Sequence, residues 1–369
     1  MVFNGAVTAW VLQVFLAIGL AADSGAWLSA QAPLWEQRFG TIVDVSTPAA
    51  APCIAVLTGG EVAVSGYDGA TIWRRDFRKF SRIFQAETVV VAPSCDWVVV
   101  TGNASYRYAW LLRRDGRDEY IGFRGVTPLA AAIHPDGQKI AITTSGPSLQ
   151  VADANPFVLR KTIPYRGFGG VEYTTADVLL ASRYGAGVIG ADDTVKWSDS
   201  NGVCDISVPE GAAWSVTACS PPHFSSIGSV TVRDTDGALR WSQVVDSPQM
   251  AAAPDGSFIA VLGAAVTVQN AREIGGERRL RFVQPNGKAI TEIAPPDGNI
   301  VGVTGAGLVI VQQYQPPTML AFSKDGTQRV VLELPGWPRG VRLAARDRST
   351  LLIWDEHRLQ AFDVRIPLR

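Results

Sequence analysis

The chain has 369 residues, of which 47% are hydrophobic, so it is long enough and apolar enough to bury a substantial core. Its 33 basic and 34 acidic residues leave a formal net charge of −1. This composition excludes a fibrous or disordered protein, and it lacks the basic excess that binds a phosphate backbone, so we expect no nucleic-acid partner.

The first segment is an almost continuous apolar run from Val2 to Ala22 that ends at Asp23. Such a run followed by small residues is typical of an export signal, with cleavage after Ala26 or Ala32. No basic residue precedes the run, so an uncleaved anchor remains an alternative, and it would be the chain's only link to a membrane. We therefore expect residues 1–32 to be a signal peptide or N-terminal anchor, and residues 33–369 to form one domain in the periplasm or outside the cell.

The rest of the chain alternates short β-branched or aromatic runs with Gly, Pro, Asn and Asp, without a helical period. Two phrases recur between these runs. The first resembles Pro-Asp-Gly and predicts the turn between a first and a second strand; it occurs at residues 134–137 and 253–256, and in weaker form at 93–96 and 209–211. The second is Asp-Gly or Asn-Gly, at residues 68–69, 115–116, 236–237, 286–287 and 325–326.

Each phrase returns about every 40 to 50 residues, which is the period of a four-stranded propeller blade. The sequence therefore predicts an all-β protein, an eight-bladed β-propeller, with seven blades if two weak units are one. The expected blades span residues 41–80, 84–124, 125–167, 168–202, 203–246, 247–295, 296–337 and 338–365. The last unit supplies three strands, so we expect the strand around Trp35 to complete it beside the strand around Phe362.

Nearly the whole mature chain carries a family resemblance. The Pro-Asp-Gly turns are similar to those of WD-repeat propellers. Residues 67–74 and 234–241, each with an Asp-Gly and a Trp five positions after the Asp, resemble the outer-strand repeat of quinoprotein-like propellers with PQQ-like repeats. The resemblance implies an architecture, which hosts binding scaffolds and enzymes alike. In this repeat, the outer-strand tryptophans are expected to pack one blade on the next; they are Trp35, Trp73, Trp197 and Trp241.

Four cysteines in an exported chain indicate two disulfides. Cys53 and Cys95 both fall at first-turn positions of neighbouring blades, on the same rim. Cys204 begins the first strand of its blade and Cys219 ends the second, on the opposite rim. We therefore expect the pairs Cys53–Cys95 and Cys204–Cys219.

No catalytic motif stands out. The three histidines lack metal-ligand spacing, no nucleophile elbow or phosphate loop occurs, and the acid pairs Asp192-Asp193 and Asp118-Glu119 fall in turns or outer strands. Quinoprotein dehydrogenases carry a disulfide of adjacent cysteines beside their cofactor, and no two cysteines here are adjacent. We therefore expect no metal and no cofactor, and we assign no catalytic residue.

The loops that join second to third strands carry aromatic and basic residues, and all of them must emerge on one rim because the strands alternate in direction. We expect the protein to be a monomeric, noncatalytic scaffold that binds a protein, peptide or glycan there. The alternative is an exported hydrolase, lyase or quinoprotein-like enzyme whose acids converge in the central channel with shifted pKa values. The candidate binding residues are Tyr106, Arg107, Tyr108, Arg183, Tyr184, His223, Phe224, Arg278 and Tyr314.

Overall fold

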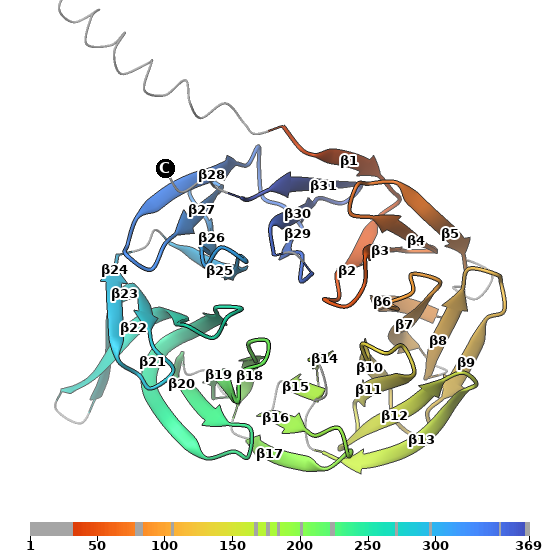
Figure 1. Cartoon of the computed structure of the whole chain (residues 1–369), viewed down its shortest axis with the longest axis horizontal. Coiled ribbons are helices and arrows are strands. Elements are labelled where there is room, and N and C mark those ends of the chain that lie inside the picture. The colour runs from red at the N-terminus through yellow and green to blue at the C-terminus, as the bar shows by residue number, and fades with distance from the viewer. Residues whose placement is uncertain are drawn as a thin grey trace, which may run out of the picture.

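The computed structural model describes residues 32–77, 84–104, 107–165, 169–174, 178–182, 185–199, 202–221, 226–269, 272–294, 297–346 and 348–365. Across these ranges every regular element is a β-strand, and the sheets stand in a ring around a central axis (Figure 1). No helix within the described part is long and apolar enough to cross a membrane. Residues 1–31 of the predicted export segment lie outside it.

Four sheets come first along the chain, each with four antiparallel strands in sequence order. The first contains β2 (Ile42–Ser46), β3 (Cys53–Thr58), β4 (Glu61–Gly66) and β5 (Thr71–Asp76). The second contains β6 (Phe84–Val91), β7 (Trp97–Ala104), β8 (Tyr108–Arg113) and β9 (Glu119–Gly122). The third contains β10 (Pro128–Ile133), β11 (Lys139–Thr144), β12 (Ser148–Ala154) and β13 (Phe157–Pro164). The fourth contains β14 (Val171–Tyr173), β15 (Val178–Ser182), β16 (Gly185–Ile189) and β17 (Val195–Asp199).

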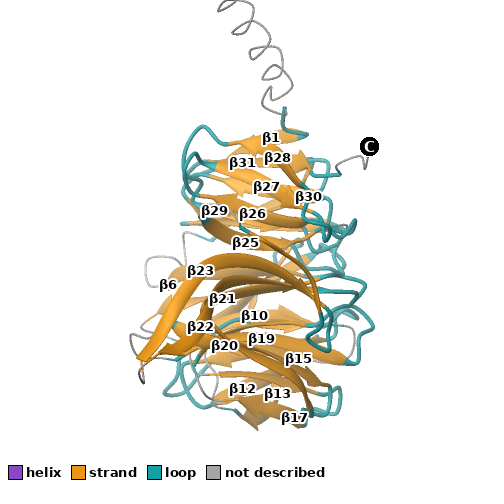
Figure 2. Ribbon diagram, turned by 90° about the vertical axis from the view of Figure 1, so that its left-hand side faces the viewer, coloured by secondary structure: helices purple, strands orange, loops and turns teal. Residues whose placement is uncertain are grey.

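A sheet of seven strands follows, because β21 (Leu239–Ala252) is long enough to end one group of strands and begin the next. Its other members are β18 (Val203–Ser207), β19 (Trp214–Ser220), β20 (Ile227–Asp234), β22 (Ile259–Gln269), β23 (Arg272–Val283) and β24 (Ala289–Ile293). The hairpin of β22 and β23 projects beyond the body of the ring (Figures 1 and 2). The next sheet contains β25 (Gly298–Val303), β26 (Val309–Gln313), β27 (Thr318–Phe322) and β28 (Gln328–Glu333).

The last sheet joins the two ends of the described chain. It contains β29 (Gly340–Leu343), β30 (Thr350–Trp354) and β31 (Arg358–Asp363), with β1 (Trp35–Arg38) at its outer edge. Trp35 lies opposite Ala361 in antiparallel register, so the predicted pairing of the N-terminal strand beside the strand around Phe362 is confirmed. This pairing covers the edge that β31 would otherwise expose.

The two recurring phrases form the expected turns. In the turn between β10 and β11, Asp136 accepts the backbone N–H of Gln138 at 2.7 Å, and Gly137 has a positive φ of 72°. In the turn between β4 and β5, Asp68 accepts the N–H of Ala70 at 2.9 Å. A side-chain acceptor two residues before its donor, followed by a residue that tolerates a left-handed backbone, is what these turns require.

The ring has two rims. The turns from first to second strand lie on one side, which we name the turn rim. The loops from second to third strand lie on the opposite side, together with the connections between successive sheets, and we name this side the loop rim.

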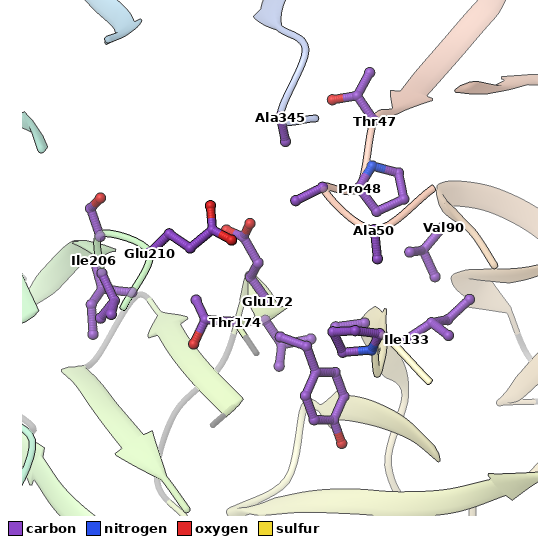
Figure 3. A pocket seen from close by; sticks show the side chains of 18 of the residues that line it. Thr47, Pro48, Ala50, Val90, Ile133, Glu172, Thr174, Ile206, Glu210 and Ala345 are labelled. Carbon is purple, nitrogen blue, oxygen red and sulfur yellow. The ribbon is translucent and has the colours of Figure 1, made fainter. Parts of the chain in front are cut away.

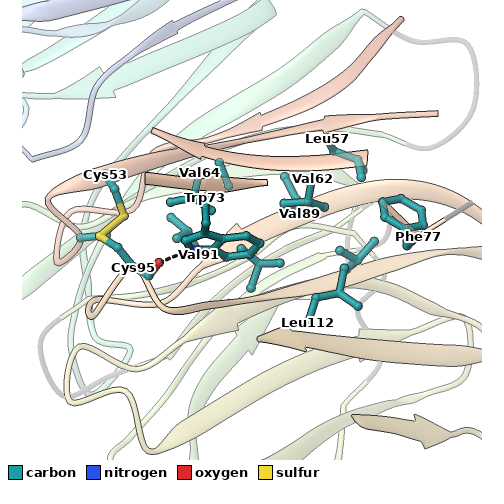
Figure 4. Packing of buried hydrophobic residues seen from close by; sticks show 14 of the residues in the cluster. Cys53, Leu57, Val62, Val64, Trp73, Phe77, Val89, Val91, Cys95 and Leu112 are labelled. Carbon is teal, nitrogen blue, oxygen red and sulfur yellow. Dashed lines mark hydrogen bonds between the residues drawn. A yellow bond between two sulfur atoms is a disulfide. The ribbon is translucent and has the colours of Figure 1, made fainter. Parts of the chain in front are cut away.

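Tryptophans of the outer strands pack onto the neighbouring sheet, as the repeat predicted. A Cβ atom added to Gly69 would lie 2.7 Å from the ring of Trp35, and one added to Gly287 would lie 2.0 Å from that of Trp241. These glycines therefore let an indole lie directly on the backbone of the next Asp-Gly or Asn-Gly turn. Trp73 is 7% exposed in an apolar cluster between the first and second sheets (Figure 4).

Both predicted disulfides are confirmed. Cys53 and Cys95 join the first two sheets on the turn rim, with Cα atoms 6.2 Å apart. Cys204 and Cys219 lie directly opposite each other in the hairpin of β18 and β19, with Cα atoms 4.1 Å apart. The backbone oxygen of Cys95 also accepts the indole N–H of Trp73 at 2.5 Å, so the first bridge and the Trp73 cluster form one interface (Figure 4).

Candidate functional site

Four of the nine predicted binding residues lie in the described part of the chain: Arg107, Tyr108, Arg278 and Tyr314. The other five lie outside the described residues and stay predictions; they are Tyr106, Arg183, Tyr184, His223 and Phe224.

Tyr108 lies on the side of the second sheet, at the start of β8. Its ring is 6.3 Å from that of Trp110 and 5.1 Å from that of Tyr120, so it belongs to an aromatic cluster along β8 and β9. Arg107 is exposed beside it, and its backbone oxygen accepts the N–H of Phe123. These two residues therefore lie next to a packed wall of the blade, on the loop-rim end of β8.

Arg278 and Tyr314 come together with two residues that sequence reasoning did not select. The Arg278 guanidinium is 2.9 Å from a carboxylate oxygen of Asp297, and the backbone oxygen of Asp297 accepts the N–H of Tyr314 at 2.9 Å. The ring of Tyr314 is 5.2 Å from that of Trp337, which is 53% exposed. We name these four residues the rim patch.

The chain positions the rim patch through four different segments of the loop rim. Arg278 is on β23, Asp297 lies in the connection from β24 to β25, and Tyr314 begins the loop from β26 to β27. Trp337 lies in the connection from β28 to β29, between Pro335 and Pro338, which hold the backbone away from regular strand. A tryptophan between two prolines is the sequence signal that could have identified this fourth residue.

The rim patch combines a stacked aromatic pair with an ion pair at the surface. Exposed aromatic rings offer a large contact area with few rotatable bonds, and a neighbouring guanidinium offers directed hydrogen bonds. Most tryptophans in this ring are needed to pack sheets together, whereas Trp337 leaves half of its surface in solvent. The patch is therefore suited to recognition.

A cavity lies at the centre of the ring, towards the turn rim. This channel cavity has a volume of about 990 Å³. Its walls are the first strands β2, β6, β10, β14, β18 and β29, and its mouth is formed by turns such as 47–50 and 208–213. Figure 3 shows the carboxyl groups of Glu172 and Glu210 directed toward each other inside it.

The electrostatics of the channel cavity centre on Glu172. Burial among the surrounding walls raises the pKa of this carboxyl, although its surface is accessible from the cavity. Arg348 and Arg342, in the order of their influence, act in the opposite direction and lower the pKa. Arg342 itself is held by Asp44, 3.7 Å away, and donates to the backbone oxygen of Val45.

The acid pairs of the sequence lie elsewhere. Asp192 accepts hydrogen bonds from Thr194 and Lys196 in an exposed turn, which lower its pKa to about 2. Asp118 pairs with Arg75, and Glu119 pairs with Arg113. Asp193 lies 4.0 Å from Lys161. These four acids are thus surface or inter-blade groups. Over the described ranges, no three His, Cys, Asp or Glu side chains form a set that could hold a metal ion.

Comparison with known proteins addresses the fold. No family profile matches the chain, and no curated protein matches it. The Dos1 propeller is similar in structure, with a TM-score of 0.64 and 8% identity, over 90% of this chain and 95% of that one. BamB from Moraxella catarrhalis gives a TM-score of 0.64 and 12% identity, over 90% and 99%.

The chain is also similar in structure to a WD40 domain. The Pan2 WD40 domain of Neurospora crassa gives a TM-score of 0.55 and 11% identity, over 92% of this chain and 97% of that domain. At these identities the likeness concerns the fold and not the function. With its four-stranded antiparallel sheets around a central axis, the chain is a β-propeller of the kind found in WD-repeat and PQQ-like proteins.

Proposed function

We propose that this β-propeller is an exported, noncatalytic scaffold that binds a protein, peptide or glycan through the rim patch. The observation that carries the proposal is the exposed Trp337, stacked on Tyr314 beside the Arg278–Asp297 ion pair. Burying a tryptophan that is already held by its neighbours costs little conformational entropy, so the pair is preorganised for a partner. The remaining predicted residues of the loop rim, from Tyr106 to Phe224, would extend the same face.

Several features support the wider proposal. Two disulfides suit an oxidising compartment, which favours residues 1–32 as a signal peptide or anchor and residues 33–369 as one exported domain. Six four-stranded sheets and one seven-stranded sheet that shares β21 between two groups favour eight blades, and the β1–β31 pairing favours closure of the ring by the N-terminal strand. We propose that the exported form is a monomer.

The channel cavity carries the observation that favours the enzyme alternative. That alternative requires acids that converge in the channel with shifted pKa values, and Glu172, whose pKa is raised by burial, faces Glu210 there. Among the described residues that line the cavity there is no histidine, cysteine or lysine. We place binding first because of the exposed Trp337 in the rim patch, and we assign no reaction to the protein.

Site-specific photocrosslinking tests the proposed binding face. A photoreactive phenylalanine derivative replaces Gln315, which is exposed in the Tyr314 loop, or Leu239, which is 60% exposed next to a turn on the opposite rim. We expect discrete adducts from position 315 in the native compartment, and their loss when Trp337→Ala is added. A glycan array with the same variants covers a carbohydrate ligand.

Two results would overturn the proposal. One is an adduct pattern that is the same from positions 315 and 239. The other is a full set of adducts from position 315, and unchanged glycan binding, in the Trp337→Ala variant.

A further inference from the structure

The channel cavity carries opposite charges on facing walls. Glu172 is on β14 and Glu210 is in the turn after β18, whereas Arg346 and Arg348 are in the turn after β29. Figure 1 shows β14 and β29 on opposite sides of the central axis. The cavity therefore has an acidic wall and a basic wall separated by the channel.

These four side chains stay unpaired although they line one cavity. Within the described ranges, no hydrogen bond or ion pair is made by the side chains of Glu172, Glu210, Arg346 or Arg348. Other charged side chains of the ring do find partners, as Arg113 does with Glu119 and Arg281 does with Glu292. In the described part of the cavity, no acid of one wall is paired with a guanidinium of the other, so both walls remain available to a ligand.

A buried hydroxyl provides a further observation. Ser215 on β19 also lines the cavity and is 2% exposed, and its Oγ has no hydrogen-bond partner in the described part of the chain. A buried polar atom without a partner costs free energy, so a ligand that supplies one is favoured. The cavity thus combines two charged walls with an unsatisfied polar group.

We propose that the channel cavity binds a short peptide whose two termini are free. Its α-amine lies between the carboxylates of Glu172 and Glu210, and its α-carboxylate lies against the guanidiniums of Arg346 and Arg348. A tripeptide spans roughly 10 Å when extended, so its two charged ends lie farther apart than those of a single amino acid and can reach groups on different walls. The volume of about 990 Å³ holds such a ligand, and the run from Ala130 to Ile133 offers an apolar surface to its side chains.

The environment of Glu172 supports this arrangement. Burial raises the pKa of Glu172, with Arg348 and Arg342 opposing it, so in the free protein the carboxylate lacks a cation at contact distance. A bound ammonium group would supply one and favour the ionised carboxylate. The other charged groups around the cavity are Glu210, Asp44 and Arg346.

Calorimetric titration of the full mature chain with three related peptides tests the proposal. Trialanine carries both charges, N-acetyl-trialanine lacks the cation, and trialanine amide lacks the anion. We expect trialanine to bind, and each blocked peptide to bind at least about tenfold more weakly, because the charged groups of one wall then lose their counter-charge on the ligand. Equal binding of all three peptides, or no binding of trialanine at millimolar concentration, would overturn the proposal.

Charge-neutral variants assign each end of the peptide. Glu172→Gln with Glu210→Gln should weaken trialanine binding and remove the effect of N-acetylation, whereas Arg346→Gln with Arg348→Gln should remove the effect of amidation. Glu333→Gln, an exposed carboxylate at the end of β28, is the matched control. If either pair fails to fold, as judged by circular dichroism, the comparison of the three peptides on the wild-type chain still decides the matter.

Trialanine binding in the channel cavity can be tested independently of partner binding at the rim patch. Trp337→Ala should leave trialanine binding unchanged, because the rim patch is on the other side of the ring. Loss of trialanine binding in that variant would place the peptide at the rim patch and contradict the channel assignment.

Discussion

Trp73 and Trp337 are the same residue type in two contrasting regions of one ring. Trp73 is 7% exposed, lies between the first and second sheets, and donates its indole N–H to Cys95. Trp337 is 53% exposed on the loop rim and stacks on Tyr314. Aromatic residues in this propeller thus divide into those that hold sheets together and those that leave surface for a partner, and burial of the side chain separates the two groups.

The largest expected effect is on stability at the buried tryptophan. Trp73→Ala should lower the free energy of unfolding by about 3 to 5 kcal/mol, because it leaves a cavity in the interface and an unpaired carbonyl oxygen on Cys95. Trp337→Ala should change it by less than about 0.5 kcal/mol. Urea unfolding followed by circular dichroism measures both, and similar losses in the two variants would break the comparison.

The next effect concerns the disulfide beside Trp73. The Cys53–Cys95 bridge closes a longer stretch than Cys204–Cys219, with sequence separations of 42 and 15. If restriction of the unfolded chain dominates, replacing both cysteines by alanine should cost about 4 kcal/mol for the first pair and about 3 kcal/mol for the second.

Coupling between the bridge and the tryptophan sharpens the comparison. Because Trp73 contacts Cys95, the Trp73→Ala and Cys53→Ala/Cys95→Ala changes should cost less together than the sum of their separate costs. The Trp337→Ala change should be additive with either disulfide. Additivity at Trp73 would show that the tryptophan and the bridge stabilise the interface independently.

The smallest expected effect is at Glu172, a polar residue in the ring's interior. Its pKa in the folded state is raised above the usual 4.5 by burial, so the folded state loses stability relative to the unfolded state as the pH rises above that value. Glu172→Gln should therefore melt at a slightly higher temperature than wild type at pH 7.5, and the difference should vanish below pH 4.5. A difference that persists at low pH would assign the effect to packing and not to ionisation.

Local chemistry explains why so much of the fold could be predicted. The Asp-Gly turns depend on a side-chain acceptor two residues from its donor, as at Asp68 and Asp136, and such contacts are encoded within a few residues. The Cys53–Cys95 pair followed from matched turn positions in neighbouring repeats, and the Cys204–Cys219 pair followed from the two ends of one hairpin. The pairing of Trp35 with the strand around Phe362 followed from the unpaired outer-strand motif at the N-terminus.

The candidate sites were predicted only in part. Arg278 and Tyr314 were selected from the sequence, but Tyr108 packs among aromatic residues on a blade wall, and Trp337 and Asp297 were missed. Which loops meet on a rim depends on how sheets lie side by side, and four separate segments supply the rim patch. The channel carboxylates carry no local signal, because Glu172 and Glu210 are ordinary residues in a short strand and a turn.

The sequence by itself therefore determined the all-β class, the repeat, the turn positions and both cysteine pairs, because each depends on residues close in the chain or at equal places in the repeat. Only the tertiary structure decided which charges face each other across the channel and which tryptophan stays exposed. The physical reason is that the ring brings its first strands around one axis, so residues such as Glu172 and Arg348, far apart in sequence, share a single cavity.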